Sequence, residues 1–248
     1  MIILKSPEEI KLMRESGRIT AELCALLKEK IAPGITTQAL DDIAVSYIRK
    51  KKAIAAFLGY HGYPKSICVS INEEVVHGIP SSRVLRDGDL VSIDAGVIYG
   101  GFVGDMAFSA GVGKVSAEAQ KLMAVTEQSL YKGIAQAKPG NYLGDISHAV
   151  QEHAESNGFS VVEQYVGHGI GRQMHEAPQV PNYGPAGCGP VLKEGITLAI
   201  EPMVNAGIFE VEVLADDWTV VTKDRKLSAH FEHTIAITAN GPEILTKI

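Results

Sequence analysis

The sequence predicts an α+β fold made of two similar halves. Two helices separated by a Pro-Gly dipeptide and followed by short apolar strands occur twice along the chain. The first dipeptide, Pro33-Gly34, is followed about 106 residues later by Pro139-Gly140. Identity between the two stretches is slight, so the order of the elements is the evidence for duplication. We expect one domain over residues 1–248, with internal halves at about 1–113 and 114–248, large enough to bury a substantial core.

The first half begins with strong helix signals. Ser6-Pro7-Glu8-Glu9 combines an N-cap serine, a proline at the first helical position and the glutamate of a capping box. This helix is expected to run to about Lys30, and Thr37 is expected to cap a second helix that ends in a basic run. Strands are expected near residues 67–71 and in a hairpin over residues 90–110, which is rich in β-branched and aromatic residues.

The second half repeats this order. Ser116 is expected to cap a long helix that runs to about Ala137, and the helix after it is expected to end near Asn157. The glycine-rich stretch 184–190 predicts a loop. Further strands are expected over Val161–Val166, Thr197–Ile200, Ile208–Val213, Trp218–Val221 and Thr234–Thr238.

Composition and charge narrow the class of protein. Apolar residues make up 46% of the chain and charged residues 21%, which is typical of a soluble globular domain. The net charge of −6 argues against a general nucleic-acid binder. The three cysteines are widely spaced and form no C-x-x-C, which predicts free thiols in a reducing compartment. The N-terminus lacks the pattern of a signal peptide and no apolar run has transmembrane length, so we expect a cytoplasmic protein.

Two acids interrupt the apolar hairpin over residues 90–110. Asp94 and Asp105 each lie among β-branched, aromatic and other apolar residues. If Tyr99 and Gly100 form a two-residue loop, the aspartates face each other on one side of the sheet, with Cβ atoms roughly 5 Å apart. Two carboxylates at that distance repel each other unless a cation or a shared proton lies between them. The hairpin therefore leads to the hypothesis of a bridged metal ion.

Three further candidate ligands lie in the second half. His168 is flanked by glycines, which let its backbone approach a ligand or another chain segment, while Glu201 and Glu232 lie at the ends of apolar strands. Taken singly, each is more often an ordinary loop or strand-end residue. Together, four acids interrupt apolar strands with only Arg172 nearby, and burying them unpaired would cost many kcal/mol. A pair of divalent cations would neutralise them, and oxygen-rich sites with one nitrogen suit Mn, Fe, Co or Zn.

Two other histidines lie near these candidate ligands in the sequence. His77 follows an apolar strand, and His175 lies seven residues after His168. His175 and Glu176 are not followed by the second histidine of an H-E-x-x-H motif, which excludes a zincin site. The alternating glycines around His168 resemble a dinucleotide-binding loop only superficially, because no helix start follows. From the residues alone, structural and functional roles for His77 and His175 are equally supported.

One family resemblance is carried by the stretches GYHGYPKSICVSINEEVVHGIP, DGDLVSIDAGVIYGGFVGDMA, GHGIGRQMHEAP, AIEPM and LSAHFEHTIAIT. They are similar to the type I methionine aminopeptidases, in their short bacterial form. The resemblance extends essentially from Ser6 to the C-terminus, and the order and spacing of the five candidate ligands make it specific. It implies the pita-bread (creatinase/aminopeptidase) fold, in which two pseudo-symmetric α+β halves surround a curved antiparallel sheet with helices on the outer face.

The resemblance implies a site for two metal ions. Asp94 would chelate one ion, and Asp105 and Glu232 would bridge both. His168 and Glu201 would complete the shell of the other ion. The two ions, Co, Mn, Fe or Zn, would lie about 3.5–4 Å apart and lower the pKa of a bridging water towards neutrality. The resulting hydroxide would attack the first peptide bond of the substrate.

The resemblance also implies catalytic roles for three side chains. Glu201 would shuttle a proton, His77 would hydrogen-bond the scissile amide, and His175 would help to stabilise the oxyanion. A free α-amine would bind a metal ion, which restricts the enzyme to N-termini. The implied activity is removal of the N-terminal methionine from nascent proteins and peptides when the second residue is small.

A pocket for the first side chain of the substrate is implied as well. An apolar, aromatic and thiol-lined slot suits an unbranched thioether. Phe57 and Met174 depart from the commoner family pattern and should both contact the pocket, so its width is left open. Without the resemblance, the aromatic residues would be interpreted as ordinary core. The implied substrate contacts are Tyr60, Tyr63, Cys68, His77 and Trp218, with His175, Phe57 and Met174 beside them.

The remaining expectations concern partners. The resemblance also implies a monovalent cation near the backbone of Asn72 and Glu74 together with Ser228. We expect a monomer that acts on the N-terminal methionine of nascent peptides and contacts the ribosome transiently. Neither a specific nucleic-acid sequence nor a membrane is expected as a partner.

Three alternatives fit the sequence less well. Prolidases and Xaa-Pro aminopeptidases of the same fold carry an additional N-terminal domain, whereas the first helix here begins after Ser6. Non-catalytic binding modules of this fold are expected to have lost metal ligands, whereas all five are present. Type II methionine aminopeptidases would carry a long helical insertion in the second half, and none is visible.

Overall fold

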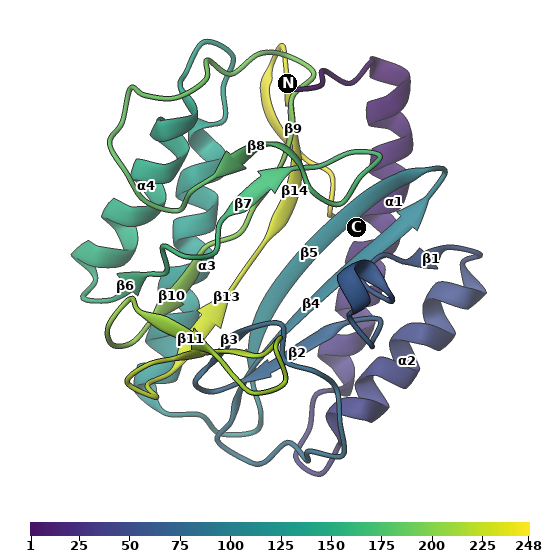
Figure 1. The fold of residues 1–248 in the computed structure, drawn as a ribbon, viewed down its shortest axis with the longest axis vertical. Coiled ribbons are helices and arrows are strands. Elements are labelled where there is room, and N and C mark those ends of the chain that lie inside the picture. The colour runs from purple at the N-terminus through teal and green to yellow at the C-terminus, as the bar shows by residue number, and fades with distance from the viewer.

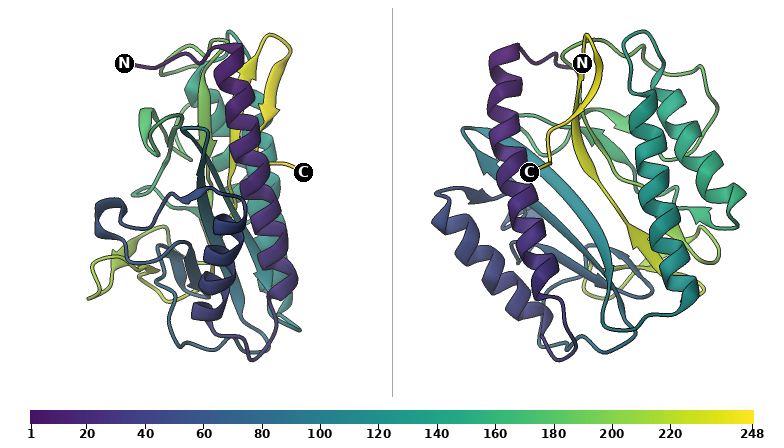
Figure 2. Two further views of the ribbon diagram at one scale, coloured as in Figure 1. Left: turned by 90° about the vertical axis from the view of Figure 1, so that its right-hand side faces the viewer. Right: turned by 180° about the vertical axis from the view of Figure 1, so that it is seen from behind.

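The computed structural model describes residues 1–248, and its helices lie on one side of the strands (Figure 1). The helices are α1 (Pro7–Lys30), α2 (Thr37–Lys50), α3 (Ala117–Gln136) and α4 (Leu143–Ser156). Seen from behind in Figure 2, α1 and α3 flank the last strands, with α2 outside α1 and α4 outside α3. The predicted α+β fold with helices on the outer face is therefore confirmed. No helix is both long and apolar enough to cross a membrane.

Fifteen strands, all paired antiparallel, form the layer in front of the helices (Figure 1). In the first half they are β1 (Ile54–Ala55), β2 (Cys68–Ile71), β3 (Glu74–Val76), β4 (Leu90–Tyr99) and β5 (Phe102–Gly111). In the second half they are β6 (Ser160–Val161), β7 (Gly167–Gly169), β8 (Glu176–Val180), β9 (Thr197–Ile200), β10 (Met203–Asn205), β11 (Val211–Val213), β12 (Val220–Thr222), β13 (Ser228–His230), β14 (His233–Thr238) and β15 (Gly241–Ile244).

Two larger sheets meet at the centre of the molecule. One has the order β1-β4-β2 with β5 paired to β4, and the other has the order β15-β14-β9-β7-β8. Between them, the amide of Glu232 donates to Ala107 O at 2.9 Å, and the amide of Asp105 donates to Thr234 Oγ1 at 3.0 Å. The two helix pairs flank this junction in the same way (Figure 2). This symmetry supports the proposed division into halves near residue 113, in the turn between β5 and α3.

Helix caps explain why the two long helices begin where the sequence predicts. The amide of Glu9 donates to Ser6 Oγ at 3.2 Å, and the amide of Ser6 donates to Glu9 Oε2 at 3.1 Å, which completes the capping box. Ser116 caps α3 in the predicted way. The second helix is capped one residue earlier than predicted, by Thr36, because the hydroxyl of Thr37 instead accepts the amide of Ser81 at 2.8 Å.

The predicted register of the central hairpin is wrong by two residues. Gly100 and Gly101 form the loop, with φ of 60° and 80°, so that Tyr99 pairs with Phe102. A two-residue loop with positive φ at both central positions favours two glycines over Tyr-Gly. Asp94 therefore lies opposite Ala107, not opposite Asp105. The two aspartates still share one face of the sheet, but as diagonal neighbours.

Several strands of the second half are shorter than predicted. The strands expected over 161–166, 208–213 and 218–221 are reduced to the short elements β6, β11 and β12. Side chains replace ladder partners at two of these places. Asp224 Oδ2 accepts the amide of Ile208, and Asp216 Oδ1 accepts the amide of Trp218, which favours turns over strands. The predicted strand at residues 197–200 is confirmed, as is the loop at residues 184–190.

Candidate metal centre

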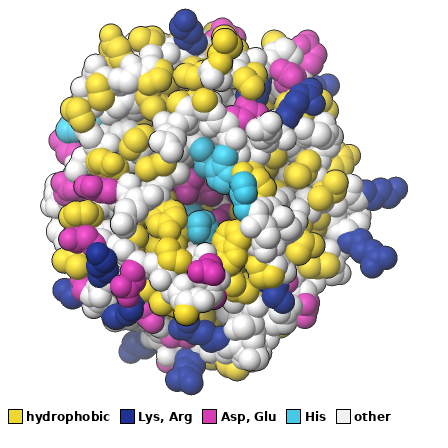
Figure 3. Space-filling model, viewed as in Figure 1, with side chains coloured by type: hydrophobic (Ala, Val, Ile, Leu, Met, Phe, Trp, Pro, Cys, Tyr) yellow, Lys and Arg dark blue, Asp and Glu magenta, His cyan; other side chains and the backbone are white.

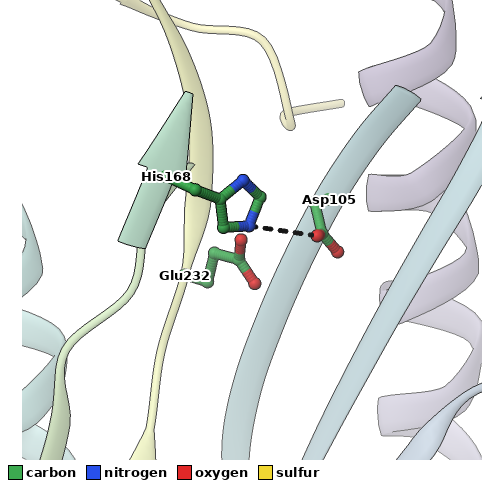
Figure 4. Close-up of side chains that lie close together, drawn as sticks. All are labelled: Asp105, His168 and Glu232. Atoms are coloured by element: carbon green, nitrogen blue, oxygen red, sulfur yellow. Dashed lines mark ion pairs between the residues drawn. The ribbon is translucent and has the colours of Figure 1, made fainter. Parts of the chain in front are cut away.

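Three buried ligand-type side chains converge where the two larger sheets meet. Asp105 projects from β5, His168 from β7, and Glu232 from the segment between β13 and β14 (Figure 4). One ligand atom from each lies within 4.8 Å of the others. The exposed fractions of these three residues are 4%, 6% and 2%, so all three are shielded from bulk water. Both halves of the chain therefore contribute to one cluster.

The remaining two predicted ligands border this cluster. Glu201 follows β9, and its Oε1 lies 3.4 Å from His168 Nε2. Asp94, on β4, lines the same cavity as the other four residues. The structure thus brings together all five predicted ligands: Asp94, Asp105, His168, Glu201 and Glu232.

Burial shifts the pKa values of the whole cluster towards neutral forms. Burial raises the pKa of Asp105 to about 7, and burial with the neighbouring acids holds the pKa of Asp94 well above its ordinary value. The pKa values of Glu201 and Glu232 are raised for the same reasons. No lysine or arginine is among the residues that line the cavity. Arg172, the only lysine or arginine near the candidate ligands in the sequence, pairs instead with Glu9 of α1.

The cluster fits a divalent cation. Asp94 Oδ1, Asp105 Oδ1 and Glu232 Oε1 are buried without a hydrogen-bond partner, and such atoms are costly unless something binds them. His168 Nδ1 donates to Gly169 O at 2.9 Å, which leaves the lone pair of Nε2 facing the acids. Carboxylate oxygens with one imidazole nitrogen are ligands that Mn, Fe, Co and Zn accept. Metal ions would therefore satisfy atoms that the protein leaves unsatisfied.

The acid cluster lies in a cavity of about 260 Å³ whose remaining wall is largely apolar and aromatic. Figure 3 shows the hollow with histidines at its rim, apolar side chains around it and acids in its depth. Every predicted substrate contact lines this cavity: Phe57, Tyr60, Tyr63, Cys68, His77, Met174, His175 and Trp218.

His175 and His77 approach the cavity from different walls. The ring of His175 lies 4.2 Å from that of His168, and its Nδ1 lies 2.6 Å from the Tyr60 hydroxyl. Burial and the nearby His175 lower the pKa of His77 to about 4, and partial burial lowers the pKa of His175. Both imidazoles are therefore neutral at pH 7. His77 also has a φ of 62°, a left-handed backbone that is uncommon for residues other than glycine.

The pocket aromatics combine packing with positioning. The hydroxyl of Tyr63 donates to Gly78 O at 3.0 Å, one residue beyond His77, and its ring lies edge-on to Trp218 at 5.1 Å. Phe57 and Met174 both press against Gly96 on β4, where an added Cβ would lie 2.8 Å from each. The two residues that depart from the family pattern therefore pack against the same glycine and line the same cavity.

The glycines around His168 are explained by contacts with other chain segments. A Cβ at Gly167 would lie 2.4 Å from Ala199 O, and one at Gly169 would lie 2.3 Å from Ala177 O. Close strand packing thus accounts for the first two glycines of the alternating stretch.

At the expected monovalent-cation site, Asn72 O accepts the amide of Ser228 at 2.8 Å, which brings these two residues together.

Sequence reasoning missed several residues of the site. His230 is 1% exposed, its Nε2 has no hydrogen-bond partner, and that atom lies 3.7 Å from Glu201 Oε2. Burial and the nearby His77 lower its pKa to about 3. The signal available was its place two residues before Glu232 in the same apolar stretch. His230 does not itself line the cavity. The cavity-lining residues that were missed are His61, Val76, Tyr165, Val166 and Met203.

Comparison with known proteins places these features in a family. The profile of metallopeptidase family M24 matches residues 11–239. Methionine aminopeptidase 1 of Bacillus subtilis (strain 168) is 57% identical over 100% of both chains, and the methionine aminopeptidase of Escherichia coli (strain K12) is 50% identical over 99% of this chain and 94% of its own. The crystal structure of methionine aminopeptidase from Thermotoga maritima matches with a TM-score of 0.99 and 48% identity over 100% of both chains.

More distant structures share the fold. The Xaa-Pro dipeptidase from Bacillus anthracis matches with a TM-score of 0.77 and 22% identity, and the match covers 99% of this chain but 62% of that one. The prolidase from Pyrococcus horikoshii OT3 matches in a similar way, with a TM-score of 0.78. These likenesses agree with the predicted pita-bread fold.

Proposed function

The chain belongs to the methionine aminopeptidases of metallopeptidase family M24, and from this we propose that it removes the N-terminal methionine of nascent proteins and peptides when the second residue is small. It is a metallo-aminopeptidase, a hydrolase. The observation that carries the proposal is the convergence of four acids, two buried and two half-buried, and one buried imidazole in the depth of a largely apolar cavity.

In this proposal the five clustered side chains hold two divalent ions, Co, Mn, Fe or Zn. When bound, such ions lower the pKa of a shared water and polarise the scissile carbonyl. The unsatisfied oxygens of Asp94, Asp105 and Glu232, with His168 and Glu201, supply the ligands. A free N-terminal amine would bind one of the ions, which favours cleavage at chain ends over cleavage within chains.

The chain's own residues then move protons and stabilise charge. Glu201 accepts a proton from the attacking water and returns it to the leaving amine. The Tyr60 hydroxyl, donating to His175 Nδ1, leaves the proton of the neutral His175 ring on Nε2, where it can be donated to the oxyanion. His77, neutral and held at the cavity wall, hydrogen-bonds the scissile amide.

The apolar wall of the cavity selects the first residue. Tyr63, Cys68 and Trp218 form a slot for an unbranched thioether, and Phe57 and Met174 limit its width. Both side chains also pack against Gly96 on β4, which supports their assignment to one wall of the slot. A monovalent cation near Asn72, Glu74 and Ser228, transient ribosome contact, a monomeric state and a cytoplasmic location complete the proposal.

Hydrolysis of short peptides tests the proposal. Met-Gly-x and Met-Ala-x peptides should be cleaved after methionine, chelator should abolish the cleavage, and a divalent metal should restore it. Xaa-Pro-x peptides serve as the matched comparison, because proline-specific enzymes share the fold. Equal or faster cleavage of Xaa-Pro-x, or activity indifferent to chelator, would overturn the proposal.

A further inference from the structure

A buried ion pair lies behind the loop that carries His175. Lys5 Nζ is 2.6 Å from Glu176 Oε2, and the two side chains are only 4% and 6% exposed. In every other lysine or arginine ion pair of the structure, the cation is at least 32% exposed. Burying both charges carries a large desolvation cost, so a pair of this kind needs a specific reason.

The pair ties the N-terminal segment to the loop between β7 and β8. The amide of Lys5 donates to Gly195 O at 2.7 Å, just before β9, which fixes the lysine backbone. Glu176 directly follows His175, and its second oxygen, Oε1, accepts the amide of Gln173 at 3.2 Å. The Glu176 carboxylate therefore has two partners: Lys5 of the N-terminal segment and the backbone amide of Gln173 within the loop. Figure 1 shows the segment before α1 passing near this loop.

The loop is also wrapped closely around the pair. A Cβ at Gly171 would lie 2.4 Å from Lys5 Cε and 2.6 Å from Glu176 Oε1. This contact explains the third glycine of the alternating stretch, for which strand packing gives no reason. Ile170, Gly171 and Met174 of the loop are buried, whereas Arg172, Gln173 and His175 are exposed. The ion pair thus adds a fixed point directly beside His175, where the loop itself is exposed.

We propose that Lys5 and Glu176 are positioning residues for His175. The pair fixes the loop so that the imidazole meets the Tyr60 hydroxyl and faces the scissile carbonyl. This inference rests on the proposed role of His175 in the reaction. Misplacement of such a group by about 1 Å costs about 10²-fold in rate. Neither residue touches substrate, so the effect passes through the loop.

The test removes the ion pair from the wild-type enzyme and from the His175→Ala variant and compares the losses of kcat. Glu176→Gln alone leaves a buried unpaired ammonium, so the variant used is Lys5→Met/Glu176→Gln, which removes both charges and keeps an amide oxygen for Gln173. On a Met-Ala-x peptide, the double variant should lose about 10- to 100-fold in kcat with KM within about twofold. In the His175→Ala background the same two changes should lower kcat less than about twofold. Equal losses in both backgrounds would overturn the inference.

A matched control removes an ion pair elsewhere. Arg14 Nε lies 2.6 Å from Glu243 Oε1 and joins α1 to β15 away from the cavity, so Arg14→Met/Glu243→Gln should leave kcat unchanged. A kcat loss in this control as large as in the Lys5 and Glu176 variant would mean that α1 stability, not loop position, is responsible, and would overturn the inference.

A second measurement separates this inference from the proposed function. Imidazole ¹⁵N spectra of the metal-free protein report the hydrogen bond at His175 Nδ1, which should weaken in the Lys5→Met/Glu176→Gln variant and persist in the control. Unchanged His175 signals in that variant overturn the inference even where Met-Ala-x is cleaved. Absence of cleavage by the wild type, or full kcat in His175→Ala, instead overturns the proposed function, and the spectra still decide whether the pair positions the ring.

Discussion

The two buried groups of charge in this molecule are satisfied in opposite ways. At the Lys5 and Glu176 pair, opposite charges lie 2.6 Å apart and the second carboxylate oxygen accepts a backbone amide. In the acid cluster, three carboxylate oxygens have no partner and no lysine or arginine lines the cavity. An acid with a complete set of partners holds the chain, whereas a buried acid without partners is prepared for a bound cation. The contrast separates structural acids from ligand-binding acids.

The largest expected effect is the loss of kcat on changing an acid of the metal-binding cluster. Glu201→Gln keeps an oxygen that can bind a metal ion but removes the proton acceptor, so kcat for a Met-Ala-x peptide should fall by about 10³-fold. Metal content, measured by elemental analysis, should be retained. Glu152→Gln, on the exposed face of α4, is the control and should keep wild-type kcat. A Glu201→Gln enzyme with more than about a tenth of wild-type kcat would contradict the proton-shuttle role.

The contrast also predicts stability changes of opposite sign in the metal-free protein. Glu176→Gln leaves Lys5 buried without a partner and should lower the free energy of unfolding by about 3–5 kcal/mol. Asp105→Asn removes a carboxylate that has no cationic partner and should raise that free energy. Urea unfolding in the presence of chelator measures both. Destabilisation of similar size in both variants would remove the distinction between the two groups.

The pH dependence of the metal-free protein is a third test. Burial raises the pKa of Asp105 from 3.8 to about 7 and raises those of Asp94, Glu201 and Glu232. Between about pH 4 and 7 folded Asp105 keeps a proton that the unfolded chain has lost, so the contribution of this group to the free energy of unfolding falls as pH rises. Burial lowers the pKa values of His77 and His168 to about 4, which gives the opposite slope below about pH 6.5, so the contribution of the acid is measured as the difference between the wild type and Asp105→Asn. Urea titrations of both proteins at several pH values with chelator measure this difference. A wild type that does not lose stability relative to Asp105→Asn as pH rises from about 4 to 7 would show that Asp105 is not buried unpaired.

Local signals made much of the fold predictable from the sequence. The caps at Ser6 and Ser116 are decided within one turn of chain, and both helices begin where predicted. The hairpin register failed because it depends on which two residues form the loop, and Gly100-Gly101 accept positive φ where Tyr99 does not. A two-residue error left the aspartates on one face, since side chains alternate with a period of two.

The site was predictable to the extent that its residues violate the pattern around them. Acids in apolar strands are conspicuous, and all five predicted ligands lie in one cavity. The Lys5 and Glu176 pair gave no such signal, because 171 residues separate its members and each is ordinary in its local sequence. His230 was missed for a related reason, since its 3.7 Å approach to Glu201 joins two segments that lie 29 residues apart in the sequence. Contacts of this kind follow only from the tertiary fold.

The smallest expected effect concerns a paired acid near the surface, Glu22 on α1. Hydrogen bonds from Lys51 Nζ at 2.7 Å and the Tyr47 hydroxyl at 2.6 Å lower the pKa of Glu22 to about 2. Because this pKa is depressed on folding, the stabilisation is present above about pH 4.5 and is lost as pH falls towards 2, the opposite slope to that of the metal-free acid cluster.

Glu22→Gln should therefore lower the free energy of unfolding at pH 7 by only about 1 kcal/mol or less, because the carboxylate is 24% exposed and water screens the interaction. Urea unfolding at pH 7 and at about pH 3 measures the change, which should shrink at the lower pH as the wild-type carboxyl begins to protonate. A loss at pH 7 as large as that of Glu176→Gln would show that burial does not set the strength of these pairs. Completeness of hydrogen bonding would then be the better criterion for separating structural acids from those that await a metal ion.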